Sequence, residues 1–386
     1  MIRAATGVLL ANRTVALALA TMLSCSVCAE VSDSAATVKP RPLLSRLAAP
    51  FVDFFSKTDT SFIEPNHYNF QTMLQNRYSY EVYRLTDNSG NSIGFVPKPS
   101  MKIGPYAGWS LIFLGVTVDV LHLNDRNRRK EWDLSLYTLP IGVDIYYRQS
   151  GDDYTIRNVK LNVPDDTEAL ENTSFSGIES SVTGVDVYYI FNHRRFSYPA
   201  AFNQSTQQKR SSGSAIAGIG FTRHTLSIDW QMLNGIFEDA LGVDLLENFD
   251  EEPLKEKVVY TDLSFSGGYG YNWVFAKNWL FASSLSVAVS RKRSIGETER
   301  GFDAIGTSLK SLRNFKFSDI TLDGVGRFGI VWNNGKIFAG ASSIIHSYNY
   351  SKSNFYTNNI FGSFNAYVGI NLGAKKAYKN SRKSKR

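Results

Sequence analysis

A strict two-residue alternation of apolar and polar side chains constrains the fold of this chain more than any other feature. It is clearest near the C-terminus, where the apolar parity comprises Phe364, Ala366, Val368, Ile370 and Leu372. A β-strand sends successive side chains to opposite faces, so this segment is a strand with one apolar and one polar face. The residues after Leu372 offer no apolar cover for that face, and a sheet without such cover is most simply closed and turned toward lipid.

The same alternation recurs in the segments 116–120, 141–147, 184–189, 226–230, 285–289 and 320–332. In several of them one parity carries charged residues and the other carries none, as a polar or water-filled interior requires. We therefore predict an all-β fold, a closed antiparallel transmembrane β-barrel of about 12 strands, within roughly 10 to 14. The predicted lumen-facing charges are Asp119, Asp144, Asp186, Asp229, Asp323 and Arg327. In the alternative fold, a soluble sandwich, the polar parity would face solvent.

Tyrosine and tryptophan gather near the ends of these segments, where a transmembrane barrel places its aromatic girdles. The residues concerned include Tyr78, Tyr83, Trp132, Tyr137, Tyr146, Tyr188, Tyr271, Trp273, Trp279 and Tyr348. Ordinary core and loop tyrosine is the alternative. Short turns such as 333–335 alternate with long polar loops such as 192–212, and residues 231–257 have a helical, acidic pattern. Such a mixture is expected when one rim faces the periplasm and the other the outside.

The N-terminal 29 residues have the pattern of a secretory signal peptide. Arg3 and Arg13 precede or flank a short apolar run, and Val27-Cys28-Ala29 supplies small residues before the predicted cleavage. A lipoprotein signal using Cys25 is the alternative. Both cysteines of the chain lie in this segment, so the predicted mature protein has no disulfide, which suits a bacterial envelope protein.

The remaining chain divides into three predicted parts. Residues 30–65 form a periplasmic lead with a short helix, which we expect to plug or pack, with a membrane-surface anchor as the alternative. Residues 66–373 form the barrel, and residues 374–386 form a basic, disordered tail. Nowhere after residue 29 does an apolar run reach the ~18 residues of a spanning helix.

The net charge of +7 belongs to the ends of the chain. The last twelve residues carry seven lysines and arginines and the signal carries two, without any acid, so the rest has a net charge of −2. This charge distribution argues against a basic binding face on the folded body, and secretion argues against nucleic acid as a partner. The expected partners are outer-membrane lipid and the barrel-assembly machinery, and the tail could contact anionic lipid or cell-wall polymer.

Motifs that carry chemistry are weak. Gly324-Val-Gly326-Arg-Phe-Gly329 matches the dinucleotide fingerprint by letters, but it lies inside a strand-period segment and not between a strand and a helix. His224 and His346 have serines nearby, which keeps a lipid-modifying barrel enzyme as an alternative. The charge run 124–131 reads as a solvated loop, with lipopolysaccharide phosphate as the sharper alternative. No histidine has metal spacing, so we predict no metal and no cofactor.

Several segments resemble an uncharacterised family of Bacteroidota envelope proteins, catalogued as domain of unknown function forty-four twenty-one. They include Asp59-Thr-Ser-Phe-Ile63-Glu-Pro65, Lys102-Ile-Gly-Pro-Tyr-Ala-Gly-Trp109 and Asp133-Leu-Ser-Leu-Tyr137. The resemblance covers roughly residues 55 to 373 and implies an outer-membrane β-barrel without an assigned activity, so it brings no functional residues. The chain departs from the usual barrel ending, because its last strand closes on Leu372 and a basic tail follows.

The sequence thus predicts a bacterial outer-membrane barrel that is not an enzyme and serves as a narrow, porin-like channel or a plugged envelope scaffold. An open lumen lined by the acidic residues above would prefer cations. The alternatives are a lipid-modifying barrel enzyme and a secreted soluble β-rich binding protein.

Overall fold

The structure is a computed structural model. It describes residues 58–375 and Tyr378, apart from residues 88, 110–111, 116, 122–129, 162–166, 243, 246–256, 295–319 and 353–354. The predicted signal peptide, the helix of the lead and most of the basic tail lie outside the described residues.

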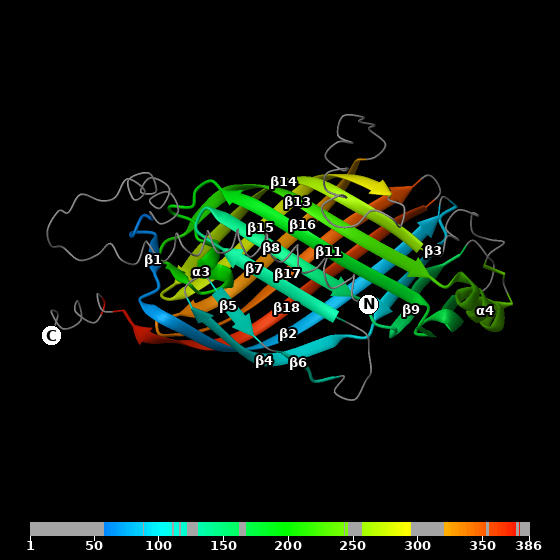
Figure 1. Cartoon of the computed structure of the whole chain (residues 1–386), viewed down its shortest axis with the longest axis horizontal. Coiled ribbons are helices and arrows are strands. Elements are labelled where there is room, and N and C mark those ends of the chain that lie inside the picture. Colours follow the sequence, from blue (N-terminus) through cyan, green and yellow to red (C-terminus); the bar gives the residue numbers. More distant parts are fainter. Residues whose placement is uncertain are drawn as a thin grey trace, which may run out of the picture.

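The chain is an antiparallel all-β protein built on one long sheet (Figure 1). Ten strands of this sheet follow one another as hydrogen-bonded neighbours: β2 (Tyr68–Asp87), β18 (Phe355–Ala374), β17 (Ile337–Lys352), β16 (Ile320–Asn333), β15 (Trp279–Ser294), β14 (Lys257–Ala276), β13 (Ser212–Ile228), β11 (Ile178–Ile190), β8 (Ile141–Gln149) and β7 (Lys130–Tyr137). Their length matches tilted strands that cross a bilayer. We call the end with Tyr68 and Ala374 the terminal end, and the opposite end the far end.

Further strands branch from β2. Its first half pairs with β4 (Ser100–Trp109), which in turn pairs with β5 (Ile112–Gly115) and β6 (Val118–Asp119). Its last residues pair with β3 (Ser92–Pro97), which continues to β9 (Tyr154–Lys160) and β10 (Ser174–Phe175). With the separate pair β1 (Ile63–Pro65) and β12 (Thr206–Gln208), the described residues contain 18 strands.

The predictions of about 12 strands and of a closed sheet are both wrong for this structure. The count is higher because the predicted lead and the predicted loop 192–212 contain the short strands β1 and β12, because β3, β9 and β10 are further short strands, and because the strand after Trp109 is split into β5 and β6. The described ladder ends at β7 on one side and at β5 and β6 on the other. We call the boundary between these ends the seam.

Side chains nevertheless bring the two ends of the sheet together. Lys102 on β4 forms a salt bridge of 2.8 Å with Glu131 on β7, and Ser79 on β2 donates to the same carboxylate at 3.1 Å. The sheet is therefore curled into a tube, and its inner space is referred to below as the lumen.

Residues 191–211, which the sequence suggested as an exposed loop, fold into the lumen at the terminal end. This segment, the plug, contains β12 and the helix α3 (Tyr198–Phe202). Its backbone enters α3 through the N-cap Ser197, whose Oγ accepts from Ala200 N, and Pro199 stands in the first turn. Ser197, Tyr198 and Ala201 are at most 1% exposed, so the part of the plug around α3 is core and not surface.

The plug is held by hydrogen bonds from strands all around the tube. Five wall residues take part. Three donate to the plug: Gln71 to Asn203 O (3.0 Å), Asn272 to Ser197 O (2.8 Å) and Asn333 to Gln204 Oε1 (3.1 Å). In addition, Gln204 donates to the wall residue Tyr367 (3.0 Å), and the hydroxyl of Tyr198 lies 2.5 Å from that of the wall residue Ser284. β1 pairs with β12 on the plug's outer side. These bonds come from β2, β14, β15, β16 and β18, and side chains of β7, β11 and β13 pack against Phe196 and Tyr198, so the plug contacts the wall on both sides of the lumen.

The far end is closed differently, by an apolar cluster that we call the cap. It combines β3, β9 and β10 with the helix α4 (Trp230–Leu241) and the short helix η1 (Thr167–Leu170). Its fully buried members include Ile93, Phe95, Tyr154, Leu170, Phe175, Ile178, Leu233, Phe237 and Leu245. Sequence periodicity correctly indicated a helix in residues 231–257, and Asp229 caps its start by accepting from Met232 N at 2.9 Å.

The outer face of the tube is apolar. Side chains exposed by more than half include Leu285, Leu322, Phe265, Ile219, Val287 and Val368, and all lie on the apolar parity of their strands. At the terminal end this belt finishes in neighbouring rings, with Trp273 5.4 Å from Phe275 and Phe275 6.0 Å from Trp279. Within the described part of the chain, no helix has the length and apolar character needed to cross a bilayer.

Two tyrosines lock β8 to β11. Tyr188 faces Gly142 across the pair, and Tyr146 faces Gly184, each ring lying over the glycine. A Cβ atom at either glycine would collide with the ring opposite, so no other residue fits. The C-terminal strand ends in an ordered contact as well, because Tyr378 stacks on His67 at 4.5 Å and Lys375 N donates to His67 O at 2.9 Å.

Candidate functional site

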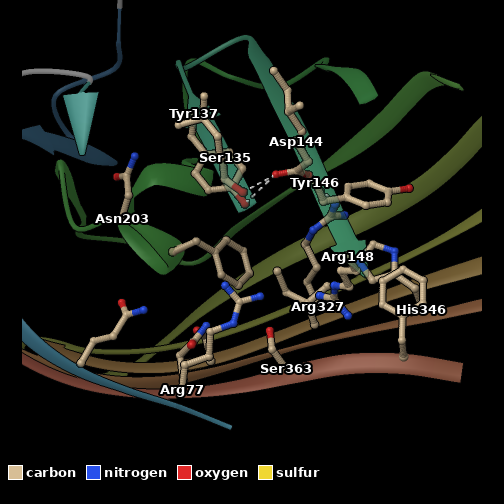
Figure 2. A pocket seen from close by; sticks show the side chains of 18 of the residues that line it. Arg77, Ser135, Tyr137, Asp144, Tyr146, Arg148, Asn203, Arg327, His346 and Ser363 are labelled. Atoms are coloured by element: carbon tan, nitrogen blue, oxygen red, sulfur yellow. Dashed lines mark hydrogen bonds and ion pairs between the residues drawn. The ribbon is translucent and has the colours of Figure 1, made fainter. Parts of the chain in front are cut away.

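Between the plug and the cap, the lumen contains a cavity of about 160 Å³, which we call the chamber (Figure 2). Its walls come from β2, β4, β7, β8, β16, β17 and β18, and the plug residues Phe202 and Asn203 form its floor. The described lining contains three guanidinium groups, Arg77, Arg148 and Arg327, and one carboxylate, Asp144. A polar chamber of this kind is the best candidate for a binding site in the described structure.

Asp144 is the most heavily bonded carboxylate of the chamber. Its Oδ2 accepts from Arg327 at 2.7 Å, and its Oδ1 accepts from Ser135 at 2.6 Å and from Tyr137 at 3.2 Å. Both side chains of the Arg327–Asp144 pair are at most 10% exposed. The charge-assisted bond and the two hydroxyl donors offset the cost of removing the pair from water.

Arg148 lies on β8, four residues after Asp144, and Arg77 lies on β2. The Arg148 guanidinium lies 4.4 Å from the centroid of the Phe361 ring, a cation–π distance. Arg77 and Arg148 both act electrostatically on Glu131, the carboxylate that Lys102 binds across the seam. The chamber thus lies directly beside the seam.

A layer of aromatic and imidazole rings separates the chamber from the cap. Tyr146 OH lies 2.8 Å from Tyr348 OH, which lies 3.3 Å from His346 Nδ1. His346 stacks on Phe361 at 4.7 Å, and His224 stacks on Tyr260 at the same distance. These rings fill the lumen in the way that side chains fill small barrels.

The structure places the predicted lumen charges in different environments. Asp144 and Arg327 meet in the chamber, and Asp186 lies opposite Asp144 in the β8–β11 register, on the same inner face. Asp323 is buried and accepts from Ser290 and from Asn349 N. Asp119 lies opposite Lys102 in the β4–β6 register and accepts from Leu121 N.

The prediction for Asp229 is wrong. Asp229 is exposed and caps α4, because β13 ends at Ile228 and the alternation that includes Trp230 continues by coincidence into the first turn of a helix.

Sequence reasoning missed Arg77, Arg148, Lys102 and Glu131. A signal for Arg148 was present, since it continues the parity of Gly142, Asp144 and Tyr146 by one further step. Arg77 and Lys102 lack such a signal, because β2 and β4 do not alternate cleanly.

The predicted girdle tyrosines divide into two groups. Tyr78, Trp132, Tyr271, Trp273 and Trp279 are exposed on the outer face, as the girdle prediction requires. The inward group comprises Tyr83, Tyr137, Tyr146, Tyr188 and Tyr348, each buried by more than 90%. The parity of a residue along its strand, and not its distance from the strand end, decides which face its ring lies on. These five tyrosines share the polar parity.

The two candidate histidines do not meet the serines adjacent to them in sequence. His346 and His224 point into the lumen, whereas Ser343, Ser347 and Ser227 lie an odd number of residues away and so occupy the opposite face of their strands. The glycines of 324–329 lie in the middle of β16, so the dinucleotide fingerprint has no helix after it. Among the described residues, no group of three or more His, Cys, Asp or Glu could hold a metal ion.

Solved structures with remote similarity are outer-membrane proteins and transporters. The translocator domain of the autotransporter NalP from Neisseria meningitidis has 8% identity and a TM-score of 0.28, with 90% of this chain and 98% of that chain covered. The P. putida toluene transporter TodX has 10% identity, a TM-score of 0.20, and coverage of 84% and 94%. The COG4313 outer membrane channel from Pseudomonas putida F1 has 8% identity, a TM-score of 0.25, and coverage of 80% and 99%. Similarity at this level carries no argument about function.

Sequence comparison is more decisive about family than about activity. No curated protein matches the chain. A match to a family of unknown function spans the whole described sheet and confirms the resemblance seen in the opening segments. With residues 57–371 matched, this chain belongs to the family described as domain of unknown function (DUF4421).

Proposed function

We propose that the chain is a bacterial outer-membrane β-barrel with a sealed lumen, a non-enzymatic envelope scaffold in the state described. The observation that carries the proposal is the inversion of polarity across the wall: apolar side chains are exposed outside, while charged and amide side chains are buried inside around a plug. A water-soluble monomer rarely exposes an apolar patch beyond a few hundred Å². Lipid contact explains the outer face.

The two ends of the tube support an orientation. Apart from the plug, connections at the terminal end are short, such as 277–278 and 334–336, whereas residues 229–256 and 295–319 connect strands at the far end. Short turns on one side are typical of the periplasmic rim. We therefore place the terminal end in the periplasm, with insertion by the barrel-assembly machinery.

Membrane insertion also bears on the seam. Hydrocarbon offers no hydrogen-bond partner to an open strand edge, so an inserted sheet has to pair its edges or cover them. The Lys102–Glu131 salt bridge already holds β4 and β7 together. In lipid we expect the β7 edge to pair with the strand after Trp109, which would close the barrel.

The buried plug separates a scaffold from a channel. Its hydrogen bonds to Asn272, Asn333, Gln71 and Tyr367 attach it to one part of the wall, and its Phe196 and Tyr198 pack against β7, β11 and β13 on the other. We expect wild-type protein in planar bilayers to show no steady conductance. Replacing residues 196–207 with a glycine–serine linker should produce stable conducting steps.

The control for the linker variant is Glu238→Gln on the exposed side of α4, which should remain silent. Wild-type protein that conducts as well as the linker variant would overturn the sealed lumen. Protein that stays in solution without detergent, and whose gel mobility does not change on heating, would overturn the membrane location.

The geometry gives little support to the alternative of a lipid-modifying enzyme. His346 Nδ1 lies next to Tyr348 OH, and the ring is sandwiched among aromatic rings inside the lumen. A histidine acting on lipid would need a nucleophile in hydrogen-bond reach and access to the substrate. Phospholipid hydrolysis that is lost in His346→Gln but kept in His224→Gln would reinstate the enzyme.

A further inference from the structure

We propose that the chamber is a binding site for one oxyanion, a carboxylate or phosphate carried on a small apolar body. The family brings no functional residues, so the residues of the chamber have no assigned role. The inference goes beyond the scaffold role. It rests on three features: the donors that line the chamber, the saturation of its one described carboxylate, and an apolar wall beside these donors.

The described lining is rich in donors. Arg77 and Arg148 present guanidinium groups, and Gln75, Asn203 and Asn365 present side-chain amides. A planar guanidinium offers paired N–H groups in the geometry of a carboxylate or phosphate, which is why arginine predominates in sites for these groups. Two arginines on neighbouring walls can grip one such group from two sides.

The carboxylate of Asp144 does not compete for these donors. Arg327, Ser135 and Tyr137 already occupy its two oxygens. The Nε–H of Arg327 makes no hydrogen bond to another described residue and is buried. An acceptor bound in the chamber would satisfy this donor, whose burial without a partner is otherwise costly.

The rest of the lining selects the body of the ligand. Ile344 and Phe361, both on the inner parity of their strands, form apolar wall beside the arginines. A volume of about 160 Å³ far exceeds the roughly 10 to 15 Å³ that one water needs. An organic acid therefore fits the site better than a bare inorganic ion.

Two sources could supply such a group. A soluble organic acid would enter from the terminal end when the plug opens, whereas a lipid headgroup would enter from the bilayer at the seam, where Tyr106 of β4 and Leu134 of β7 both line the chamber. The shared chemistry is the oxyanion, and the experiment separates the two sources.

The test uses the full mature chain folded in non-ionic detergent. Sodium octanoate, sodium phosphate and sodium chloride are titrated at equal ionic strength, and thermal unfolding is followed. Octanoate should raise the unfolding temperature of wild-type protein above the value in chloride. Arg77→Gln and Arg148→Gln should each weaken its affinity by about tenfold or more, because each removes a charge-assisted bond.

The matched control is Arg84→Gln, a change to an exposed arginine on the same strand as Arg77. In the lipid arm, protein is taken from nanodiscs of phosphatidylglycerol or phosphatidylcholine into native mass spectrometry. A phosphatidylglycerol adduct that disappears in both arginine variants, without an octanoate effect, would assign the lipid source.

The proposal fails if no anion stabilises wild-type protein relative to chloride and no lipid adduct is retained, or if Arg84→Gln weakens binding as much as Arg77→Gln. Should the arginine variants not fold, Asn365→Asp provides the second test. It keeps every arginine and adds a negative charge to the chamber wall, so it should abolish binding of the oxyanion while preserving the heat-dependent gel shift.

Discussion

The two ends of the lumen are closed by different physics. At the terminal end, hydrogen bonds and two small apolar clusters hold one segment of the chain against the wall. At the far end, one larger cluster of apolar side chains from six strands and two helices packs into a core. Hydrogen bonds between protein groups contribute about 1 kcal/mol each in net terms, whereas one buried aromatic side chain contributes several times more. The plug is therefore the end that can yield, and the cap is the end on which folding depends.

The largest effect is expected in the cap. Phe237→Ala removes a fully buried ring from α4 and should destabilise the protein by about 3–5 kcal/mol. The measurement is urea unfolding in detergent. Phe265→Ala, on the lipid-facing side, is the control and should cost within about 1 kcal/mol in the same assay. Equal losses in the two variants would mean that the cap is not a folding core.

A slightly smaller loss is expected between the two ends. Arg327→Met leaves Asp144 buried without its cation and should cost roughly 3 kcal/mol, whereas the double variant Asp144→Leu/Arg327→Met should recover most of the stability. A double-mutant cycle from urea unfolding gives the coupling. If the double variant is no more stable than Arg327→Met, then the pair is not the reason for the loss.

The plug should respond through its permeability more than through its stability. Asn272→Ala removes the donors to Ser197 O and Gln208 Oε1 and should cost about 1–3 kcal/mol. Because this loss falls on one end, we expect brief conducting events in planar bilayers, together with a smaller fall in the urea midpoint than in Phe237→Ala. Asn358→Ala, at the far end of β18, is the control and should stay silent. Brief conducting events in both variants would mean that the conductance does not depend on the plug.

The weakest effect concerns the attachment of the plug to β1. Ser61 donates to the exposed Asp59 carboxylate, and with Arg195 nearby this lowers the pKa of Asp59 below its ordinary value of 3.8. A depressed pKa means that the contribution is complete above the unfolded pKa and is lost as the pH falls through the folded one. Incubation at acidic pH should therefore make Arg195 more susceptible to proteolysis. The cleavage is measured in a brief protease pulse after the protein is returned to neutral pH, and this pulse detects the opening only if reclosure is slow. Direct hydrogen exchange of the Ile63 amide below pH 4 checks the same loss, and Asp59→Asn should remove its pH dependence.

The sequence predicted the wall better than its contents. Alternation in β8, β11, β15 and β18 correctly gave strands, their outer faces and the inner position of Asp144, because a period of two is a local property of the backbone. The plug was not predictable in this way. Residues 191–211 are polar, and only the wall residues opposite them, far away in sequence, make burial of Gln204 and Asn203 favourable.

The chamber could be predicted only in part. Asp144 and Arg327 were identified singly by parity, but their pairing joins residues 183 positions apart and depends on the curvature of the sheet. The expected acidic bias of the lumen also changes, since Asp144 is neutralised by Arg327 and further cations line the same space. Cation preference stays a prediction for a plug-free barrel, and we now expect it to be weak.

The reciprocal Tyr188–Gly142 and Tyr146–Gly184 contacts have a consequence for how the tube could ever widen. Each ring bridges two strands and lies over a glycine, which has no side chain. Sliding β8 along β11 by one residue would therefore bring both rings into collision with side chains at once. That part of the wall behaves as a single rigid panel. Any change in the circumference of the tube must occur on the other side of β7, at the edge that the Lys102–Glu131 salt bridge holds.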